Sequence, residues 1–288
     1  NNTYATHYEY NKRGQQTLVT DAELRSTNYE YDLGGRLLKV INAKGHYTRY
    51  AYDKDGNRTD VWYVRNGLEV NTHYTYYNNH LLRTTDYPGF SGRNVATNYY
   101  DGNGNLTDKT DAKNQTITYA YDKNNRLTTK TYPNSTTVAY TYDAETNLLT
   151  TLDVNTDTEN QYDDLSRLIT VTNKKYSPNK IIQYEYYEDG LRKKMTGPET
   201  DVIDYAYDKA KRLDIIKKNT VQIADYDYNS LGIRTKLTEG NGAYAENTFD
   251  ATTRWLTGVY NKKSDATVIS SFVYTHDKIG NRKTMTLA

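Results

Sequence analysis

Residues 29–37 read Tyr-Glu-Tyr-Asp-Leu-Gly-Gly-Arg-Leu, and the same pattern returns at residues 50–59 as Tyr-Ala-Tyr-Asp-Lys-Asp-Gly-Asn-Arg-Thr. Alignment on the aspartate of this pattern finds a copy every 20 to 27 residues, most often every 21, along the whole chain. The aligned positions are Asn11, Asp32, Asp53, Tyr77, Asp101, Asp122, Asp143, Asp163, Tyr187, Asp208, Asn229, Asp250 and Asp277. Thirteen copies therefore cover the chain, with no unrelated segment between them.

Each copy has the pattern of two strands and two turns. In Tyr-x-Tyr both rings fall on one face of an extended chain, because side chains alternate along a strand. Asp-x-x-Gly is turn chemistry, since Asp accepts hydrogen bonds from nearby backbone amides and Gly takes a positive φ without steric cost. The run rich in Thr, Val and Leu that follows predicts a second strand. No helical period persists over ten residues, so we expect an all-β chain of tandem antiparallel hairpins.

Two of the longer intervals between copies predict extended hairpins. Asn66-Gly67 lies between alternating apolar residues, which is the strongest short-range hairpin signal. Ser177-Pro178-Asn179 separates a Lys-Tyr segment from Ile181 and Ile182, which indicates a second hairpin. The extra length is therefore expected in the hairpin tips.

Composition excludes several classes of function. The net charge is +1, which argues against a dedicated nucleic-acid binder, and the chain has no Cys for disulfides, thiolate metal sites or nucleophiles. The sequence contains no run of 18 apolar residues, so it predicts no membrane-spanning helix. Tyr supplies 32 of the 288 residues, against 3 Phe and 2 Trp. We therefore expect a folded chain whose core is built from tyrosine, with a partner for each buried hydroxyl.

The repeats resemble the YD repeat of the Rhs (rearrangement hotspot) family, which occurs in wall-associated toxins, in the BC component of Tc toxins and in teneurins. The resemblance implies a coiled antiparallel strip, shell or solenoid, with residues 1–288 forming a single array of about thirteen repeats, a fragment of a longer repeat region. In toxin members the shell encloses a C-terminal toxin domain. Some members cleave themselves at an Asp-Pro motif, and this sequence has no Asp-Pro dipeptide, so that activity is not carried over.

The recurring residues are expected to be structural. Regular recurrence favours rings that pack between successive strands, because a scaffold residue repeats whereas a binding site is local. Five arginines recur at one repeat position and are expected to form a ladder of pairs, each with a neighbouring Asp: Arg36, Arg126, Arg167, Arg212 and Arg254. The motif residues are Tyr29, Tyr31, Asp32, Gly35, Arg36, Tyr50, Tyr52, Asp53, Gly56, Tyr119, Tyr121, Asp122, Arg126, Tyr140, Tyr142, Asp143, Tyr205, Tyr207, Asp208 and Arg212.

Departures from the pattern are the better candidates for a binding site. Trp62, Phe90 and Trp255 are large aromatic residues that depart from the repeat pattern. Their rings suit stacking on sugars, although packing within a hairpin explains each of them as well. They define an alternative function, a carbohydrate- or receptor-binding module that uses Tyr and Trp side chains.

The sequence predicts no metal, cofactor or catalytic residue. Two turns place oxygen ligands at alternate positions, as the start of a calcium loop does, but lack its later Gly and Glu, so turn capping is expected. These turns are Asp53-x-Asp55-x-Asn57 and Asp101-x-Asn103-x-Asn105. No nucleophile elbow, phosphate loop or dinucleotide fingerprint is present, and a glycosidase pair among the many carboxylates is the enzymatic alternative.

The leading hypothesis is a non-enzymatic scaffold, secreted or displayed on the surface of a bacterium, that builds a shell, fibre or adhesive surface. Its expected partners are adjoining repeats or copies of itself, an enclosed C-terminal toxin domain in the full-length protein, and glycans. Nucleic acid and membrane insertion are not expected. We expect both terminal strands to expose unpaired backbone groups, which favours end-to-end association.

Overall fold

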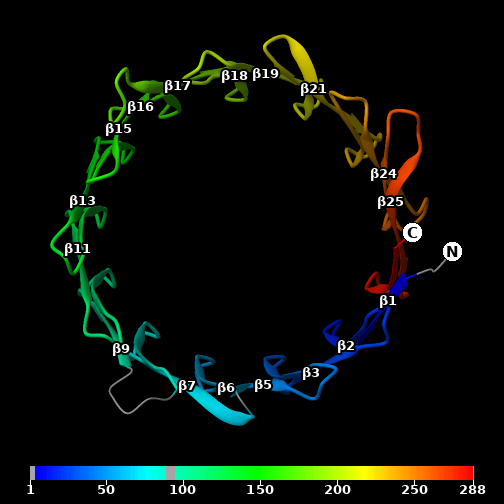
Figure 1. The fold of residues 1–288 in the computed structure, drawn as a ribbon, viewed down its shortest axis with the longest axis horizontal. Coiled ribbons are helices and arrows are strands. Elements are labelled where there is room, and N and C mark those ends of the chain that lie inside the picture. The colour runs from blue at the N-terminus through cyan, green and yellow to red at the C-terminus, as the bar shows by residue number, and fades with distance from the viewer. Residues whose placement is uncertain (1–3, 66, 89–94, 288) are drawn as a thin grey trace. The chain divides into compact units, whose positions relative to one another are not determined.

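The chain folds into strands and turns. A computed structural model describes residues 4–65, 67–88 and 95–287, and its 26 strands are the only regular elements in those ranges (Figure 1). Neighbouring strands are antiparallel and joined by short turns, which confirms the all-β hairpin prediction. None of the described segments is a helix long and apolar enough to span a membrane. The chain divides into two compact units, residues 46–183 and the remaining N- and C-terminal parts.

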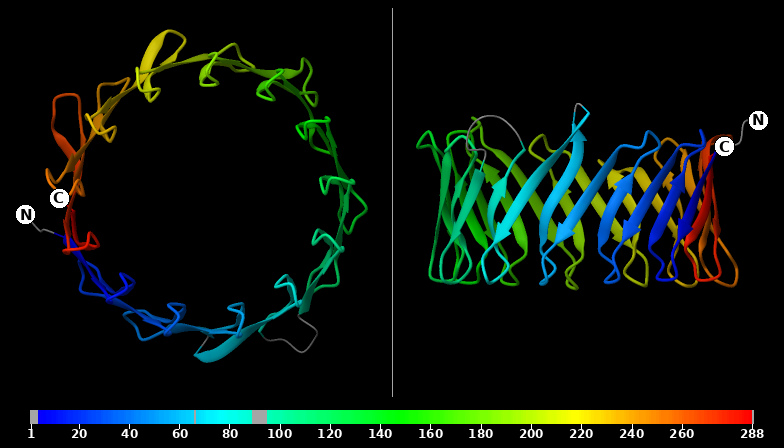
Figure 2. Two further views of the ribbon diagram at one scale, coloured as in Figure 1. Left: turned by 180° about the vertical axis from the view of Figure 1, so that it is seen from behind. Right: turned by 90° about the horizontal axis from the view of Figure 1, so that it is seen from below.

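Residues 46–183 form a single-layered antiparallel meander in which each strand pairs with the next (Figure 1). Its strands are β5 (Tyr47–Tyr52), β6 (Arg58–Arg65), β7 (Leu68–Tyr76), β8 (Leu82–Asp86), β9 (Val95–Tyr100), β10 (Leu106–Thr110), β11 (Thr116–Tyr121), β12 (Leu127–Thr131), β13 (Thr137–Tyr142), β14 (Leu148–Leu152), β15 (Asp157–Tyr162), β16 (Leu168–Asn173) and the first part of β17 (Lys180–Tyr186). The turns lie in two rows, one at each edge of the layer (Figure 2).

Residues 1–45 and 184–288 form the other unit, which is also a single antiparallel layer. Its strands are β1 (Tyr4–Tyr10), β2 (Gln16–Thr20), β3 (Ser26–Tyr31), β4 (Leu37–Ile41), the last part of β17, β18 (Arg192–Thr196), β19 (Val202–Tyr207), β20 (Leu213–Lys218), β21 (Val221–Tyr228), β22 (Arg234–Glu239), β23 (Tyr244–Phe249), β24 (Leu256–Lys262), β25 (Val268–His276) and β26 (Arg282–Leu287). Within this unit the first and last strands of the chain lie side by side (Figures 1 and 2).

The expectation of unpaired terminal strands is wrong. β1 pairs with β2 on one side and with β26 on the other, in a register that runs from Tyr4 opposite Leu287 to His7 opposite Thr284. We call this β1–β26 pairing the seam. Because the backbone groups along the seam are used within the chain, these strands do not offer the open edges on which end-to-end association was predicted.

Both extended hairpins form where the sequence predicts them. β6 and β7 stay paired up to Arg65 opposite Leu68, and Gly67 has a φ of 77° in the tip, while Asn66 lies outside the described residues. β16 and β17 stay paired up to Asn173 opposite Lys180, and residues 174–179, which include Ser177-Pro178-Asn179, form the tip.

One face of the sheet carries the tyrosines and is half-buried, and in several strands the residue between two tyrosines is exposed on the other face. In β11, Tyr119 and Tyr121 are half-buried, whereas Ala120 between them is exposed, and β3 shows the same alternation. Val138, at 7 % exposure, is the one apolar side chain that is buried among the described residues. The tyrosine core is therefore a half-buried face of a single layer.

A register shift of one residue occurs in most of the described repeats, just before the second tyrosine of the motif. In the β11–β12 pair, Ala120 lies opposite Thr129 but Tyr121 lies opposite Leu127, so Thr128 is an extra residue in β12. Such a bulge increases the local twist of the strands. Equivalent shifts precede Tyr31, Tyr52, Tyr76, Tyr142, Tyr162, Tyr207 and Tyr228.

Candidate functional site

The aspartate of the repeat caps the turn that follows it. In the β11–β12 turn, Asp122 Oδ1 accepts hydrogen bonds from the N–H groups of Asn124 (2.8 Å) and Arg126 (3.0 Å), and Oδ2 accepts one from Arg126 Nε (2.6 Å). The backbone closes the same turn through a bond from Asn125 N–H to the Asp122 carbonyl at 3.1 Å. Asn125 has a φ of 59°, the left-handed conformation that Gly35 and Gly56 adopt in their own turns.

The same donors stabilise the charged form of these carboxylates. Hydrogen bonds from the backbone and guanidinium of Arg126 lower the pKa of Asp122 below its usual value. Corresponding residues lower the pKa of the capping carboxyl in other turns, at Asp32, Asp53, Asp101, Asp163, Asp208 and Asp277. These oxygens are occupied by donors of their own turn, and among the described residues no group of three or more His, Asp or Glu is placed to hold a metal ion.

The motif arginines pair within their own turn. Arg36, Arg126 and Arg167 each contact the aspartate four residues earlier at 2.6 Å, and Arg212 does the same with Asp208. These pairs are partly exposed and contribute little to stability individually. Arg126 Nη1 also donates to the carbonyl oxygen of the next capping residue, Asp143, at 2.7 Å. The arginine therefore joins successive turns through a carbonyl oxygen.

The second tyrosine of the motif joins successive repeats. The backbone pairing of β12 with β13 ends at Thr129 opposite Ala139, so the Leu127 carbonyl lies beyond the ladder. The Tyr142 hydroxyl donates to that carbonyl oxygen at 2.8 Å. A side chain thus satisfies a backbone acceptor that lies past the end of the β12–β13 ladder.

The same bond recurs along the chain, and we call it the tyrosine ladder. The distance from the hydroxyl to the carbonyl oxygen lies between 2.7 and 3.0 Å for Tyr31 to Gln16, Tyr76 to Arg58, Tyr100 to Leu82, Tyr121 to Leu106, Tyr162 to Leu148, Tyr207 to Arg192 and Tyr228 to Leu213. Burial raises the pKa of the donor phenol in Tyr31, Tyr121 and Tyr142. The uncharged phenol, which can donate the bond, is therefore the favoured form.

The first tyrosines of the motif lie on the half-buried face in the middle of their strands. They are Tyr29 in β3, Tyr50 in β5, Tyr119 in β11, Tyr140 in β13 and Tyr205 in β19. Cationic side chains lie between some of these rings: the Arg58 guanidinium carbon is 6.0 Å from the Tyr50 ring centroid and 5.3 Å from that of Tyr74. Such contacts favour the packing role over a free aromatic surface.

Trp62 is covered by a charged neighbour. It lies in β6 opposite Arg49 of β5, and the Arg49 guanidinium carbon is 3.8 Å from the Trp62 ring centroid. Arg49 is held by Glu69 of β7 through two hydrogen bonds of 2.9 and 3.0 Å, and Tyr47 donates to the same carboxylate at 2.8 Å. The bonds from Arg49 and Tyr47 lower the pKa of Glu69 to about 2. Packing within the β5–β7 sheet accounts for Trp62 here.

Trp255 packs on the turn of the next repeat. Its ring lies 5.4 Å from that of His276, and a Cβ built on Gly280 would meet its Cε2 at 2.9 Å. The Asp250 turn has one extra residue, so that Arg254 occupies the left-handed position with a φ of 66° and Trp255 supplies the closing carbonyl. The prediction that Arg254 occupies the same turn position as the motif arginines is therefore wrong. Phe90 lies outside the described residues.

Three turns in the described part of the chain have a tyrosine where comparable turns have a capping Asp, and each tyrosine lines a groove. Tyr77 lines a groove of about 450 Å³, Tyr187 one of about 640 Å³, and Tyr132, in a turn at the other edge, one of about 600 Å³. In all three turns an Asn or Asp two residues later caps the turn instead. The capping bonds run to Asn79 from Leu81 at 3.4 Å, to Asp189 from Leu191 at 3.2 Å and to Asn134 from Thr136 at 3.1 Å.

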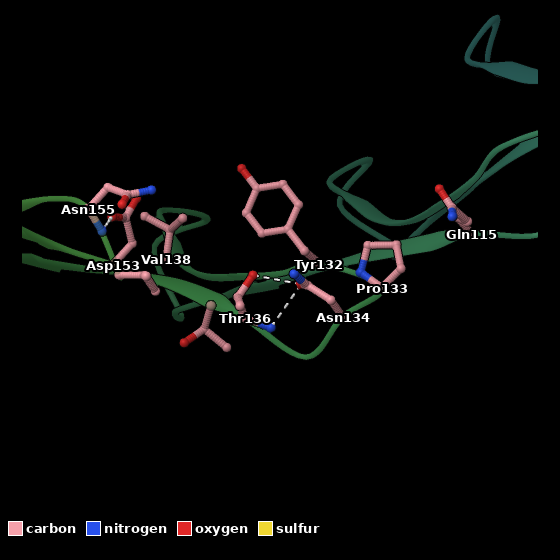
Figure 3. A pocket seen from close by; sticks show the side chains of 10 residues that line it. Gln115, Tyr132, Pro133, Asn134, Thr136, Val138, Asp153 and Asn155 are labelled. Atoms are coloured by element: carbon pink, nitrogen blue, oxygen red, sulfur yellow. Dashed lines mark hydrogen bonds between the residues drawn. The ribbon is translucent and has the colours of Figure 1, made fainter.

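The Tyr132 groove shows why the exchange opens space. Figure 3 shows the Tyr132 ring standing away from the strand, while Asn134 bonds to Thr136 and Asp153 bonds to Asn155. A capping carboxylate would lie folded into its own turn, whereas the ring projects out of it. The gap between neighbouring turns is therefore left open to solvent, with polar amides on its walls.

Parts of the chain also match a known family of repeats. Residues 10–47, 100–137 and 121–158 match the family model described as RHS Repeat. The chain carries RHS repeats. No curated protein matches this RHS-repeat chain in sequence.

Solved structures show the same fold. The RHS-repeat chain is similar to TcdB2–TccC3 solved with Cdc42 (TM-score 0.55, 14 % identity, 98 % of this chain and 20 % of that one) and to TcdB2–TccC3 alone (0.56, 15 %, 98 % and 20 %). It is also similar to a Tc holotoxin pore of Photorhabdus luminescens (0.56, 14 %, 97 % and 17 %). The chain spans about a fifth of the length of the first two, so it corresponds to a part of them. The fold and the repeat together make the chain a structural β-repeat scaffold.

The grooves of the RHS-repeat chain were missed by the sequence reasoning, although a signal was present. Tyr77 and Tyr187 stand at aligned positions where most copies of the repeat have Asp or Asn, so their two copies are degenerate. Tyr99 is a second missed signal, because the residue between the two motif positions is small or polar in most other copies. The bulge left no signal, since one extra residue does not change the composition of the second strand.

Proposed function

We propose that residues 1–288 form one array of thirteen repeats and serve, without enzymatic activity, as part of the wall of a shell in a secreted or surface-displayed RHS-repeat protein. The observation that carries the proposal is the tyrosine ladder, in which Tyr142 bonds Leu127 and its equivalents do the same in repeat after repeat. A bond that recurs at each step stabilises an extended wall, because every repeat is held mainly by its neighbours.

The structural neighbours support a toxin-associated role. TcdB2–TccC3 and the Photorhabdus luminescens holotoxin are toxin assemblies, and their chains contain this fold over nearly the whole length of residues 1–288. We infer that the full-length protein encloses a C-terminal toxin domain, with adjoining repeats as the immediate partners. The net charge of +1 supports the prediction that the chain binds neither nucleic acid nor an anionic membrane.

The state of the repeat carboxylates supports a role other than glycoside hydrolysis. A general acid in a glycosidase needs a raised pKa. The carboxyls of Asp122, Asp163 and Asp208 have lowered pKa values and are engaged by the donors of their own turns. They are therefore suited to capping.

Protection of a passenger protein tests the wall role. A small protease-sensitive domain is fused after Ala288, and its cleavage by trypsin is compared with that of the free domain. The control is the same passenger joined to an unrelated β protein, which should be cleaved at the rate of the free domain. Slower cleavage only in the fusion with residues 1–288 supports a shell. Cleavage at the free rate would reject enclosure. Filaments in electron microscopy, or binding of the chain to cells, would then favour a fibre or an adhesive surface.

A further inference from the structure

Two of the grooves are built in the same way. In one, the Tyr77 and Tyr100 rings meet edge to face with centroids 5.9 Å apart at 89°, and in the other Tyr187 and Tyr207 meet at 6.1 Å and 85°. The Tyr77 hydroxyl donates to the Asn98 carbonyl at 3.1 Å, and that of Tyr187 donates to a carbonyl of the following repeat at 3.2 Å. The fold thus contains the same groove twice, once in each compact unit.

The linings of the two grooves differ in charge. The Tyr187 groove contains Glu188, Asp189 and Lys211, with Lys211 Nζ 3.0 Å from Asp189 Oδ2. In the Tyr77 groove the two corresponding acidic positions are Asn78 and Asn79, both exposed amides. The Tyr187 groove therefore carries an ion pair on its wall, whereas the Tyr77 groove has neutral amides at the same place.

The carboxylate in the Tyr77 groove is already engaged. Asp101 Oδ1 accepts hydrogen bonds from Asn103 N–H and Asn105 N–H, both at 2.9 Å, and Oδ2 accepts one from Asn105 Nδ2 at 2.8 Å. These bonds lower the pKa of Asp101 and keep its charge within the turn. The side chains left to meet a ligand are therefore amides and phenols.

Tyr99 is the feature that separates the two grooves most clearly. Its counterpart in the Tyr187 groove is Ala206, and the equivalent residues elsewhere include Ala120 and Thr141. The Tyr99 side chain is 51 % exposed and makes no hydrogen bond or ring contact with the described part of the chain. A large aromatic ring exposed at a position that other copies fill with small residues does not serve the packing of the sheet.

We propose that the Tyr77 groove binds a neutral saccharide, with Tyr99 as the stacking ring and the amides of Asn78 and Asn79 as hydrogen-bonding groups. One face of a pyranose ring is a patch of C–H groups that packs on an aromatic ring, and its hydroxyls pair with carboxamides. A groove of about 450 Å³ with aromatic walls and few polar groups is typical of a ligand site. The absence of Lys and Arg from its described lining disfavours an anionic ligand. This site is independent of the wall role.

The test starts with the full chain on an array of neutral and acidic glycans. Free oligosaccharides of the glycans that bind are then titrated calorimetrically. We expect neutral glycans to bind, and Tyr99→Ala to weaken that binding by about tenfold or more, because it removes the stacking ring. Asn78→Ala, which changes an exposed turn residue, should weaken it as well. Tyr99→Phe should keep most of the affinity, since the ring face remains.

The duplicated groove supplies the matched control. Glu188→Gln changes the position equivalent to Asn78 and should leave binding as in the wild type. The Tyr99 and Asn78 variants should keep the wild-type melting temperature, because neither side chain has a partner in the described part of the chain. The proposal is overturned if no neutral glycan binds, if only acidic glycans bind, or if Tyr99→Ala binds like the wild type. Equal loss in Glu188→Gln or in Trp62→Ala would overturn it too.

Discussion

The Tyr142 hydroxyl donates a hydrogen bond to the carbonyl oxygen of Leu127, fifteen residues earlier in the chain, at 2.8 Å. Leu127 is the first residue of β12 and Tyr142 the last of β13, and the backbone ladder between these strands does not extend to this point. The Leu127 carbonyl, beside the bulge at Thr128, and the tyrosine that binds it belong to successive copies of the repeat. The motif therefore connects each repeat to the one before it.

Removal of that hydroxyl should destabilise the fold without opening a cavity. We expect Tyr142→Phe to lower the free energy of unfolding by about 1 kcal/mol, because the Leu127 carbonyl loses its donor. Urea unfolding followed by circular dichroism gives the difference. Tyr99→Phe is the matched control, since the Tyr99 hydroxyl has no bond to lose in the described chain, and equal losses in both variants would contradict the ladder.

The alternation of the strands could be predicted from sequence, but the acceptors of the hydroxyls could not. Tyr-x-Tyr and Asp-x-x-Gly determine local conformation, so the positions of β11 and β12 follow from residues close in the chain. The acceptor of Tyr142 depends on a one-residue bulge at Leu149 in its own hairpin and at Thr128 in the previous one. The seam likewise pairs strands from opposite ends of the sequence, and no local pattern encodes that choice.

The same distinction applies to the candidate site. Trp62 and Trp255 were predicted as binding residues because tryptophan is rare in the chain. Rarity does not show whether a ring is exposed or packed against other residues. Arg49 lies over Trp62, and Trp255 packs against Gly280. The departure that leaves an exposed ring is Tyr99, whose residue type is the commonest aromatic in the chain and so is inconspicuous. Only its position in the repeat marks it.

The turn cap should tolerate an amide better than a methyl group. Asp122→Ala removes the acceptor of three hydrogen bonds, so we expect the thermal midpoint to fall by about 2–4 °C. The thermal midpoint of Asp122→Asn should fall less, because the remaining side-chain oxygen still accepts the backbone hydrogen bonds, as those of Asn11 and Asn229 do in their turns. Asp55→Ala, in an exposed turn position whose carboxylate has no partner in the described chain, is the control. A larger loss in Asp55→Ala than in Asp122→Ala would argue against the cap.

Acid should destabilise the protein through these carboxylates. The folded pKa values of Asp32, Asp122 and Asp208 are lower than their ordinary values, mainly because backbone and side-chain N–H groups bind the charged form. A depressed folded pKa contributes stability above the ordinary pKa and loses it as the pH falls through the folded value. Melting temperatures should therefore hold between pH 7 and about pH 5 and decline below pH 4.

Replacement of these caps tests the source of that decline. In a variant with Asp32→Asn, Asp122→Asn and Asp208→Asn, the difference in melting temperature between pH 7 and pH 3 should become smaller, because fewer groups gain protons on unfolding. Glu69, with a folded pKa of about 2, remains in this variant and should preserve part of the acid sensitivity. An undiminished decline would assign acid sensitivity to other groups.

The seam should protect the chain from self-association. Deletion of residues 1–10 removes β1 and leaves β2 and β26 each with an unpaired edge, and such edges pair with other chains. We expect light scattering after size exclusion to give at least twice the mass of the full chain. Deletion of residues 1–3, which keeps the whole of β1, is the matched control and should leave the mass unchanged.

A charge on the newly exposed edge separates strand pairing from general misfolding. Thr286 lies opposite Ala5 in the seam, and Thr286→Lys in the chain lacking β1 should restore the smaller mass, because a lysine on an edge strand opposes pairing with a second copy. Circular dichroism should show β structure in all of these proteins. If the chain without β1 kept the mass of the full chain, or if Thr286→Lys left its association unchanged, backbone pairing at the seam would not be what protects these edges.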